Sequence, residues 1–266
     1  MNESSVLRDQ LEEIYTRYNK REFVHPDPLE FLYRYANIED REIAGLVASG
    51  LAYGRVNLIL KSTGTVLDLL GSSPSEFLTS CEITSIEEGL ENFKHRFTAG
   101  REMTAFLVSI SSLQKEYGPI GNYFASLMQT MPYIEALDAF AAEVVTRMEK
   151  LNCSSGHLLP RPSRGSACKR LHLFMRWMVR HDDVDPGGWY MISASELIVP
   201  VDVHMHRVGI QLGFTKRKVA DGKTAKEITD GFRMVSSDDP VKYDFALTRY
   251  GIQRLTECDL FRKLLS

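Results

Sequence analysis

The chain has 266 residues, of which 44% are hydrophobic and 25% charged, and its formal net charge is −3. This balance is typical of a globular protein with one large or two small domains, and it argues against a strongly basic nucleic-acid-binding protein while leaving local basic patches open. Four scattered cysteines without a CxxC pair, no signal peptide and no bilayer-spanning apolar run predict a cytoplasmic protein without a metal site, a cofactor or a membrane partner.

Apolar residues recur at helical spacing along the first half of the chain. The spacing predicts helices over 5–19, 27–36, 40–71 (two helices meeting near Ala52–Arg55), 105–128 and 136–151. Residues 152–167 follow, and their content of Ser, Gly and Pro predicts an irregular segment.

The second half is also predicted to be helical, with short breaks. Helices are expected over 168–181, 193–197, 201–213, 224–235 and 239–255. Strand-like alternation is confined to short pieces, so the predicted fold class is all-α. The irregular segment predicts a boundary between a lobe that includes the chain termini and a second lobe at about 40–165.

A basic run lies where the irregular segment enters the helix predicted from residue 168. Residues 161–180 contain six Arg or Lys and no Asp or Glu. Such a run is typical of a solvated helix face, but beside a helix N-terminus it also makes a site for a phosphate group. The residues expected to contact a DNA backbone here are Arg164, Gly165, Ser166, Ala167 and Arg170.

Lys169 lies at the start of that helix, where the helix dipole disfavours a cation. A lysine nucleophile must be neutral, and positive surroundings favour the neutral amine. An exposed lysine without a catalytic role is the simpler alternative.

Asp202 lies between apolar residues and a predicted helix. Aspartate is favoured as a helix N-cap, which is the structural interpretation. A carboxylate at this position also stays ionised, so it can stabilise a developing cation or accept a proton. The two interpretations are compatible.

The segment VPVDVHMHRV, residues 199–208, resembles the aspartate segment of the helix-hairpin-helix DNA glycosylase superfamily, most closely that of the 8-oxoguanine DNA glycosylases. On this resemblance Asp202 is the essential aspartate. Residues 165–169 resemble the end of the hairpin, with Lys169 in the place of the lysine nucleophile of bifunctional members. Residues 42–78 resemble the early helices of these enzymes and residues 243–253 a late helix. The whole chain is also similar to a bacterial family known only as conserved hypothetical proteins.

The resemblance implies an all-α, two-lobed helix-hairpin-helix glycosylase fold with a degenerate hairpin. It implies base-excision repair of oxidised purines such as 8-oxoguanine in double-stranded DNA, by a monomer that uses no cofactor. Lys169 would form a Schiff base with the sugar, and Asp202 would stabilise the positive charge on it.

Two features depart from the superfamily pattern. The usual Leu-Pro-Gly-Val-Gly hairpin is replaced by residues 162–167, and the interval from Lys169 to Asp202 is longer than in most members. Archaeal 8-oxoguanine glycosylases have a similarly long interval and an irregular hairpin, which makes them the nearest functional analogue.

Further residues are candidates for contacts with DNA or with the flipped base. His204 and Arg207 are expected to contact DNA, with helix capping or an internal ion pair as the alternatives. Flat or polar side chains proposed for the base pocket are Tyr53, Trp177, Trp189, Tyr243 and Asp244, and for the tryptophans a place in the core is an equal alternative. His204 and His206 lack a third ligand at useful spacing, so no metal site is predicted.

Three other functions stay open. The protein could bind damaged DNA without excising a base, or be a monofunctional glycosylase in which Asp202 activates water. It could also be a helical interaction protein, which would show no salt-dependent DNA binding.

Overall fold

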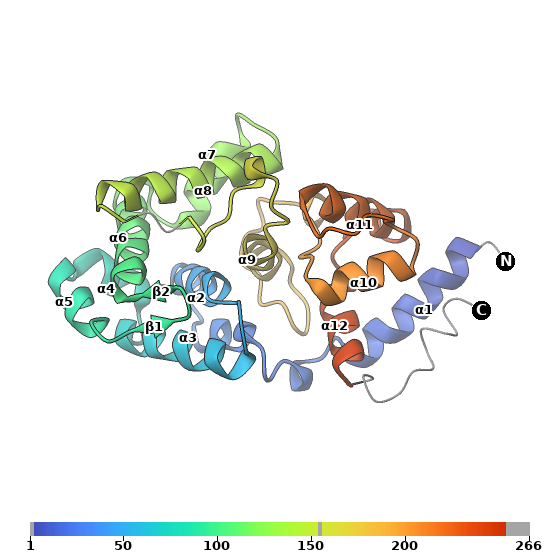
Figure 1. The fold of residues 1–266 in the computed structure, drawn as a ribbon, viewed down its shortest axis with the longest axis horizontal. Coiled ribbons are helices and arrows are strands. Elements are labelled where there is room, and N and C mark those ends of the chain that lie inside the picture. Colours follow the sequence, from blue (N-terminus) through green and yellow to red (C-terminus); the bar gives the residue numbers. More distant parts are fainter. Residues whose placement is uncertain (1–2, 154–155, 254–266) are drawn as a thin grey trace. The chain divides into compact units, whose positions relative to one another are not determined.

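A computed structural model describes residues 3–153 and 156–253, and most of these residues are helical (Figure 1). The chain forms two compact units, which are described separately: unit 1 comprises residues 1–24 and 165–266, and unit 2 comprises residues 25–164. No helix in the described ranges is both long and apolar enough to cross a membrane.

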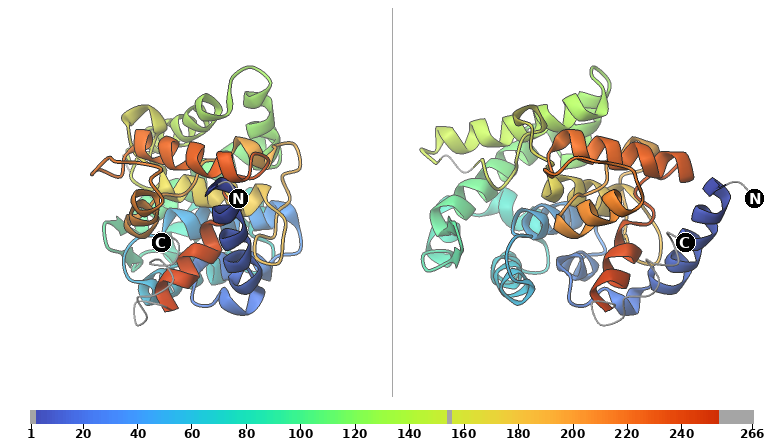
Figure 2. Two further views of the ribbon diagram at one scale, coloured as in Figure 1. Left: turned by 90° about the vertical axis from the view of Figure 1, so that its right-hand side faces the viewer. Right: turned by 45° about the vertical axis from the view of Figure 1, so that its right-hand side comes forward.

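Unit 1 combines the two ends of the sequence. Its elements are α1 (Glu3–Tyr18), a 3-10 turn (Arg21–Phe23), α9 (Lys169–Val179), a 3-10 turn (Ala194–Glu196), α10 (Val203–Gln211), α11 (Gly222–Val235) and α12 (Asp244–Gln253). Helix α1 packs on α12, and the two stay side by side in both further views (Figure 2). The largest fully buried side chains of this unit are Trp177, Trp189, Tyr243, Tyr250, Phe174, Phe232 and Phe245.

Unit 2 is a continuous stretch of chain. Its elements are a 3-10 helix (Pro28–Arg34), α2 (Ile38–Gly50), α3 (Val56–Leu70), α4 (Pro74–Ser80), α5 (Ile83–Gly89), β1 (Lys94–His95), β2 (Thr98–Ala99), α6 (Gly100–Tyr117), α7 (Ile120–Met128), α8 (Tyr133–Lys150) and a 3-10 turn (Pro162–Arg164). Helix α6 packs on α4, α7 and α8, and the strands pair antiparallel. Phe106, Phe124 and Phe140 lie in its core.

The predicted helical character is confirmed, including the break between α2 and α3 near Ala52–Arg55. Four predicted helices differ from those observed. Residues 105–128 are divided between α6 and α7, which Gly118 and Pro119 separate, and residues 193–197 contain only a 3-10 turn (Ala194–Glu196). Pro28–Arg34 is a 3-10 helix, and the helix expected from residue 239 begins only at Asp244, because turn bonds precede it (Lys242 N–H to the Asp239 carbonyl). Residues 254–255 of that prediction lie outside the described residues. The short α4 and α5 and the β1–β2 hairpin were not predicted.

Candidate functional site at Lys169 and Asp202

The turn that leads into α9 has two residues with left-handed backbone. Gly165 has φ +76°, which glycine adopts without strain, and Cys168 has φ +44° although it carries a side chain. The Ser166 hydroxyl oxygen accepts the Cys168 N–H at 3.1 Å. A non-glycine residue in this conformation costs roughly 1 kcal/mol or more, so the surrounding structure must hold Cys168 in place. This conformation sets the direction in which α9 and Lys169 begin.

The same turn is attached to the start of α11. Ser166 forms an isolated β-bridge with Asp221, and the Gly222 N–H donates to the Gly165 carbonyl at 3.0 Å. A Cβ atom on Gly222 would lie 3.1 Å from the Ser166 carbonyl oxygen, so glycine permits this close approach. The turn is therefore anchored within unit 1 on the side that follows Gly165.

Lys169 and Asp202 meet at the N-termini of α9 and α10. Lys169 is the first residue of α9, and its Nζ lies 3.3 Å from Asp202 Oδ2. Asp202 is the N-cap of α10, and its Oδ1 accepts the Met205 N–H at 2.9 Å. The side chains are 35% and 33% exposed, so both are open to a ligand. The predicted helix start at Lys169 and the predicted N-cap at Asp202 are confirmed.

The surroundings of Asp202 favour its ionised form. Burial alone would raise the pKa of Asp202, but the ammonium of Lys169 and the Met205 N–H together hold this pKa below its ordinary value. A carboxylate with a lowered pKa is a weak proton acceptor. Its chemistry at this position is therefore to stabilise positive charge.

The two histidines after Asp202 bond to backbone carbonyls. His204 Nε2 lies 3.2 Å from the Leu247 carbonyl oxygen, and its ring lies where a side chain on Gly251 would be. His206 Nε2 lies 2.9 Å from the Arg217 carbonyl oxygen. Both rings therefore tie α10 to neighbouring segments of unit 1.

The predicted DNA-contacting residues differ in exposure. Arg164, Gly165, Ser166 and Arg207 are exposed, Arg170 and His204 are half-buried, and Ala167 is buried. No ion pair involves Arg207 within the described part of the chain. A polyanion such as DNA could therefore contact the exposed residues, and Arg207 would not have to give up an ion pair to bind it.

The basic run is not a single solvent-facing surface, which corrects the expectation from the sequence. Arg176 and Arg180 are buried, and Arg176 Nε lies 3.1 Å from Asp185. Arg176 also binds Asp244, and Arg180 binds Asp182, Asp185 and Asp239. Aspartates that follow the run thus neutralise Arg176 and Arg180. Two of them, Asp239 and Asp244, are distant in the sequence, so the run itself gives no sign of them.

Four of the base-pocket candidates lie in the interior of unit 1. Trp177 and Trp189 have no exposed surface, and Trp189 packs edge-on against Phe174 with ring centroids 5.2 Å apart. The Tyr243 hydroxyl donates to Glu12 at 2.7 Å. The two tryptophans thus take the core placement that the sequence left open, and Tyr243 is buried as well.

Asp244 is 6% exposed and its carboxylate is held by Arg176. Burial, opposed by Arg176, raises the pKa of Asp244 to about 6. This side chain therefore belongs to the buried ion-pair network that also holds Asp185, and sequence reasoning missed Arg176 as its partner.

Tyr53 belongs to unit 2 and lies beside the β1–β2 hairpin. Its hydroxyl lies 2.7 Å from Thr98 Oγ1 and donates to the His95 carbonyl at 3.0 Å. The Tyr53 ring is parallel to that of Phe97, with an interplanar angle of 3°, and Phe97 is 74% exposed. Phe97 was not singled out from the sequence, because its exposure depends on the unpredicted hairpin.

Comparisons with known proteins give one match. A family model with the description "Protein of unknown function (DUF2400)" matches residues 27–253. No curated protein and no solved structure matches the chain.

Proposed function

This chain belongs to the family described as "Protein of unknown function (DUF2400)", and we propose that it is a base-excision-repair DNA glycosylase with AP lyase activity. The observation that carries the proposal is the contact between Lys169 Nζ and Asp202 Oδ2 at 3.3 Å. The resemblance of residues 199–208 to the 8-oxoguanine DNA glycosylases supports an oxidised purine in double-stranded DNA as the substrate. We propose that the protein acts as a monomer.

Stability gives little reason for this pair of residues. Asp221 caps α11 as Asp202 caps α10, and each accepts the N–H of the third residue after it at 2.9 Å. Asp221 also has a cation beside it, Arg217 with Nη2 2.6 Å from Oδ2, but this arginine comes from the loop before α11. Lys169 differs because it lies at a helix start, where the dipole disfavours a cation. A partly exposed ion pair contributes about 0–1 kcal/mol. A reaction that needs an amine and a carboxylate together explains the pair better.

The proposed reaction begins when the Lys169 ammonium gives up one proton to water, and the neutral amine then attacks. Its lone pair forms a bond to C1′ as the bond from C1′ to the base breaks, and the electron pair leaves with the base, which takes up a proton from water. The C1′–O4′ bond then breaks, O4′ takes a proton, and a protonated imine remains on Lys169. Asp202 lies where its negative charge stabilises the positive charge that develops on the sugar.

Strand cleavage follows from the imine. Loss of a proton from C2′ expels the 3′-phosphate, and water then hydrolyses the imine to release the lysine. Asp202 is too weak a proton acceptor to be assigned the C2′ proton, in line with its lowered pKa. The exposed residues Arg164, Gly165, Ser166 and Arg207 are proposed to bind phosphates around the site.

Borohydride trapping tests the proposal. The protein is incubated with a duplex containing 8-oxoguanine, and in parallel with one containing an abasic site, and is then reduced. Wild-type protein should form a covalent adduct. Lys169→Gln should form none, and Asp202→Asn should lose base release.

Lys223→Gln is the matched control for the lysine. Lys223 is an exposed lysine in the first turn of α11, two residues after the cap Asp221, and this variant should trap like wild type. Base release without an adduct would indicate a monofunctional glycosylase. DNA binding without base release or adduct formation would indicate a damage-binding protein. The absence of salt-dependent DNA binding would indicate a helical interaction protein.

A further inference from the structure

An acidic pocket of about 280 Å³ lies in unit 2, lined by the first turns of α2 and α4. Glu39 and Asp40 come from α2 and Glu76 from α4. The other lining residues are Asn37, Ser73, Ser75, Thr79, Gln114, Gly118 and Pro119. No Lys, Arg or His lines the pocket, and across residues 3–153 and 156–253 none forms an ion pair with its carboxylates. Within the described ranges no cationic side chain therefore offsets these carboxylates, and only the N-terminal dipoles of α2 and α4 reduce their negative charge.

Gln114 supplies an independent observation. This side chain of α6 lines the acidic pocket and is only 6% exposed. Its Nε2 donates to Ser75 Oγ at 2.9 Å, whereas its buried Oε1 has no hydrogen-bond partner in the described structure. A buried acceptor without a donor is costly, by about 1–3 kcal/mol in typical proteins. Oε1 can only accept, so a ligand that contacts it must be a donor.

Two of the three carboxylates of the acidic pocket, Glu39 and Asp40, are already held in place. The Ser75 N–H donates to Asp40 Oδ1 at 2.8 Å, and the Ser75 hydroxyl donates to Glu39 Oε2 at 3.4 Å. The Thr79 hydroxyl donates to the Ser75 carbonyl at 2.9 Å. Because these contacts fix Glu39 and Asp40, a ligand would have to order only the exposed Glu76 carboxylate.

The chemistry of the lining selects the class of ligand. Carboxylates and an unpartnered amide oxygen together require a cation that donates hydrogen bonds. Nowhere in the described ranges do three or more acidic, histidine or cysteine side chains converge closely enough to hold a metal ion. We propose that the acidic pocket binds an alkyl diamine or polyamine, whose ammonium groups are separated by an apolar spacer and so match dispersed carboxylates.

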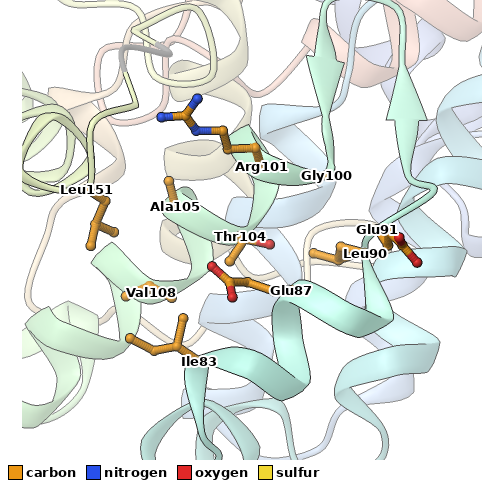
Figure 3. A pocket seen from close by; sticks show the side chains of 10 residues that line it. All are labelled: Ile83, Glu87, Leu90, Glu91, Gly100, Arg101, Thr104, Ala105, Val108 and Leu151. Atoms are coloured by element: carbon orange, nitrogen blue, oxygen red, sulfur yellow. The ribbon is translucent and has the colours of Figure 1, made fainter.

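A second cavity in the same unit provides a contrast. Its volume is about 360 Å³, and Figure 3 shows that both the Arg101 guanidinium and the carboxylates of Glu87 and Glu91 belong to its wall. Ile83 and Leu151 add apolar surface. Because its wall carries charges of both signs, this cavity does not select a cation, and its two glutamates serve as controls.

Isothermal titration calorimetry with putrescine at low ionic strength tests the proposal. Putrescine should bind the wild-type chain, while the neutral analogue 1,4-butanediol should give no heat of binding. The double variant Glu39→Gln/Glu76→Gln should bind putrescine about tenfold more weakly or worse, because two of the three carboxylates lose their charge. Glu87→Gln/Glu91→Gln should bind like wild type.

Three outcomes would overturn the proposal: no binding of putrescine to wild type, equal weakening in both double variants, or binding of MgCl₂ that matches putrescine in affinity. The second would indicate attraction to surface charge in general. Circular dichroism establishes that each variant is folded. As a further check, Gln114→Glu places a carboxylate at the unpartnered acceptor and should tighten putrescine binding.

Discussion

Lys169 Nζ and Asp202 Oδ2 lie 3.3 Å apart, and each residue stands at the N-terminus of its own helix. The N-terminus of each helix carries positive dipole charge. That charge favours the negative Asp202 and disfavours the positive Lys169. Asp202 offsets the charge of Lys169 as well as the dipole of α10. Removing the negative charge should therefore affect chemistry more than folding.

Asp202→Asn should separate these two effects. Asparagine caps a helix about as well as aspartate, so the free energy of unfolding should change by less than about 0.5 kcal/mol, while Asp202→Ala should lose about 1 kcal/mol. Urea denaturation measures both. Asp221→Asn, at the equivalent cap of α11, should leave adduct formation unchanged. A large loss of stability in Asp202→Asn but not in Asp221→Asn would show that the negative charge of Asp202 stabilises the fold.

His172 should make the protein sensitive to mild acid. It is 4% exposed, its Nδ1 has no partner among the described residues, and burial lowers the pKa of His172 from 6.5 to about 4. Between these values the unfolded chain binds a proton that the folded chain does not, so stability falls as the pH falls. The loss from pH 8 to pH 5 should be roughly 2 kcal/mol.

Denaturation curves of wild type and His172→Gln at the two pH values check this. The variant should lack that part of the pH dependence, even if it is less stable at pH 8. Asp244 contributes with the opposite sign in the same range, because its pKa is raised to about 6 and its protonation at lower pH favours the folded state. The comparison of the two proteins cancels this contribution, and identical pH profiles would refute the assignment.

The buried ion pairs of unit 1 should matter far more than exposed ones. Asp185 is fully buried and binds both Arg176 and Arg180, so Asp185→Asn leaves two buried guanidinium groups short of a carboxylate. We expect a loss of about 3–5 kcal/mol in urea denaturation. Asp68→Asn breaks an exposed pair with Arg34 and should cost less than about 1 kcal/mol. Similar costs for the two variants would contradict this account.

Gly251 should be coupled to His204. An alanine Cβ at 251 would lie 1.9 Å from His204 Cε1, so Gly251→Ala must displace the imidazole ring at a cost of about 1–3 kcal/mol. In the His204→Ala background the same change should stabilise α12 by up to about 1 kcal/mol, because alanine is the better helix former. A double-mutant cycle measures the coupling, and additive effects would rule out the contact.

Arg207 should contribute to DNA binding through a phosphate. It is exposed, and Arg207→Gln should weaken binding to all duplexes alike and lower the slope of log K against log salt by about 1. Fluorescence anisotropy over a range of salt concentrations measures the slope. Arg17→Gln, an exposed arginine on α1, is the control and should leave the slope unchanged. An unchanged slope in Arg207→Gln would remove Arg207 from the proposed interface.

Local patterns were sufficient for most of the helices, whereas the pairing of Lys169 with Asp202 was expected only from the resemblance of residues 165–169 and 199–208. The spacing of apolar residues predicts α2, α3 and α9, and with α9 the place of Lys169, while residue type predicts the N-cap Asp202. These features depend on neighbours within a few residues. The short α4 escaped prediction because seven residues give too few turns for a period to be recognised.

Features that depend on distant partners could not be predicted in this way. Arg176 and Asp244 are far apart in the sequence, and neither segment shows that the two will share a buried ion pair. Similarly, Trp177 carries no local sign of whether it packs in a core or faces a base. The unpartnered oxygen of Gln114 becomes evident only when α6 is placed beside α4.

The packing of α1 on α12 means that unit 1 is completed only late in synthesis. Helix α1 is translated early, but its Tyr18 can pack on Tyr250 of α12 only after that helix has left the ribosome. Unit 2 is complete long before that and can fold while translation continues. A truncated product that ends within unit 2 therefore carries neither Lys169 nor Asp202, so prematurely terminated chains lack the proposed chemistry.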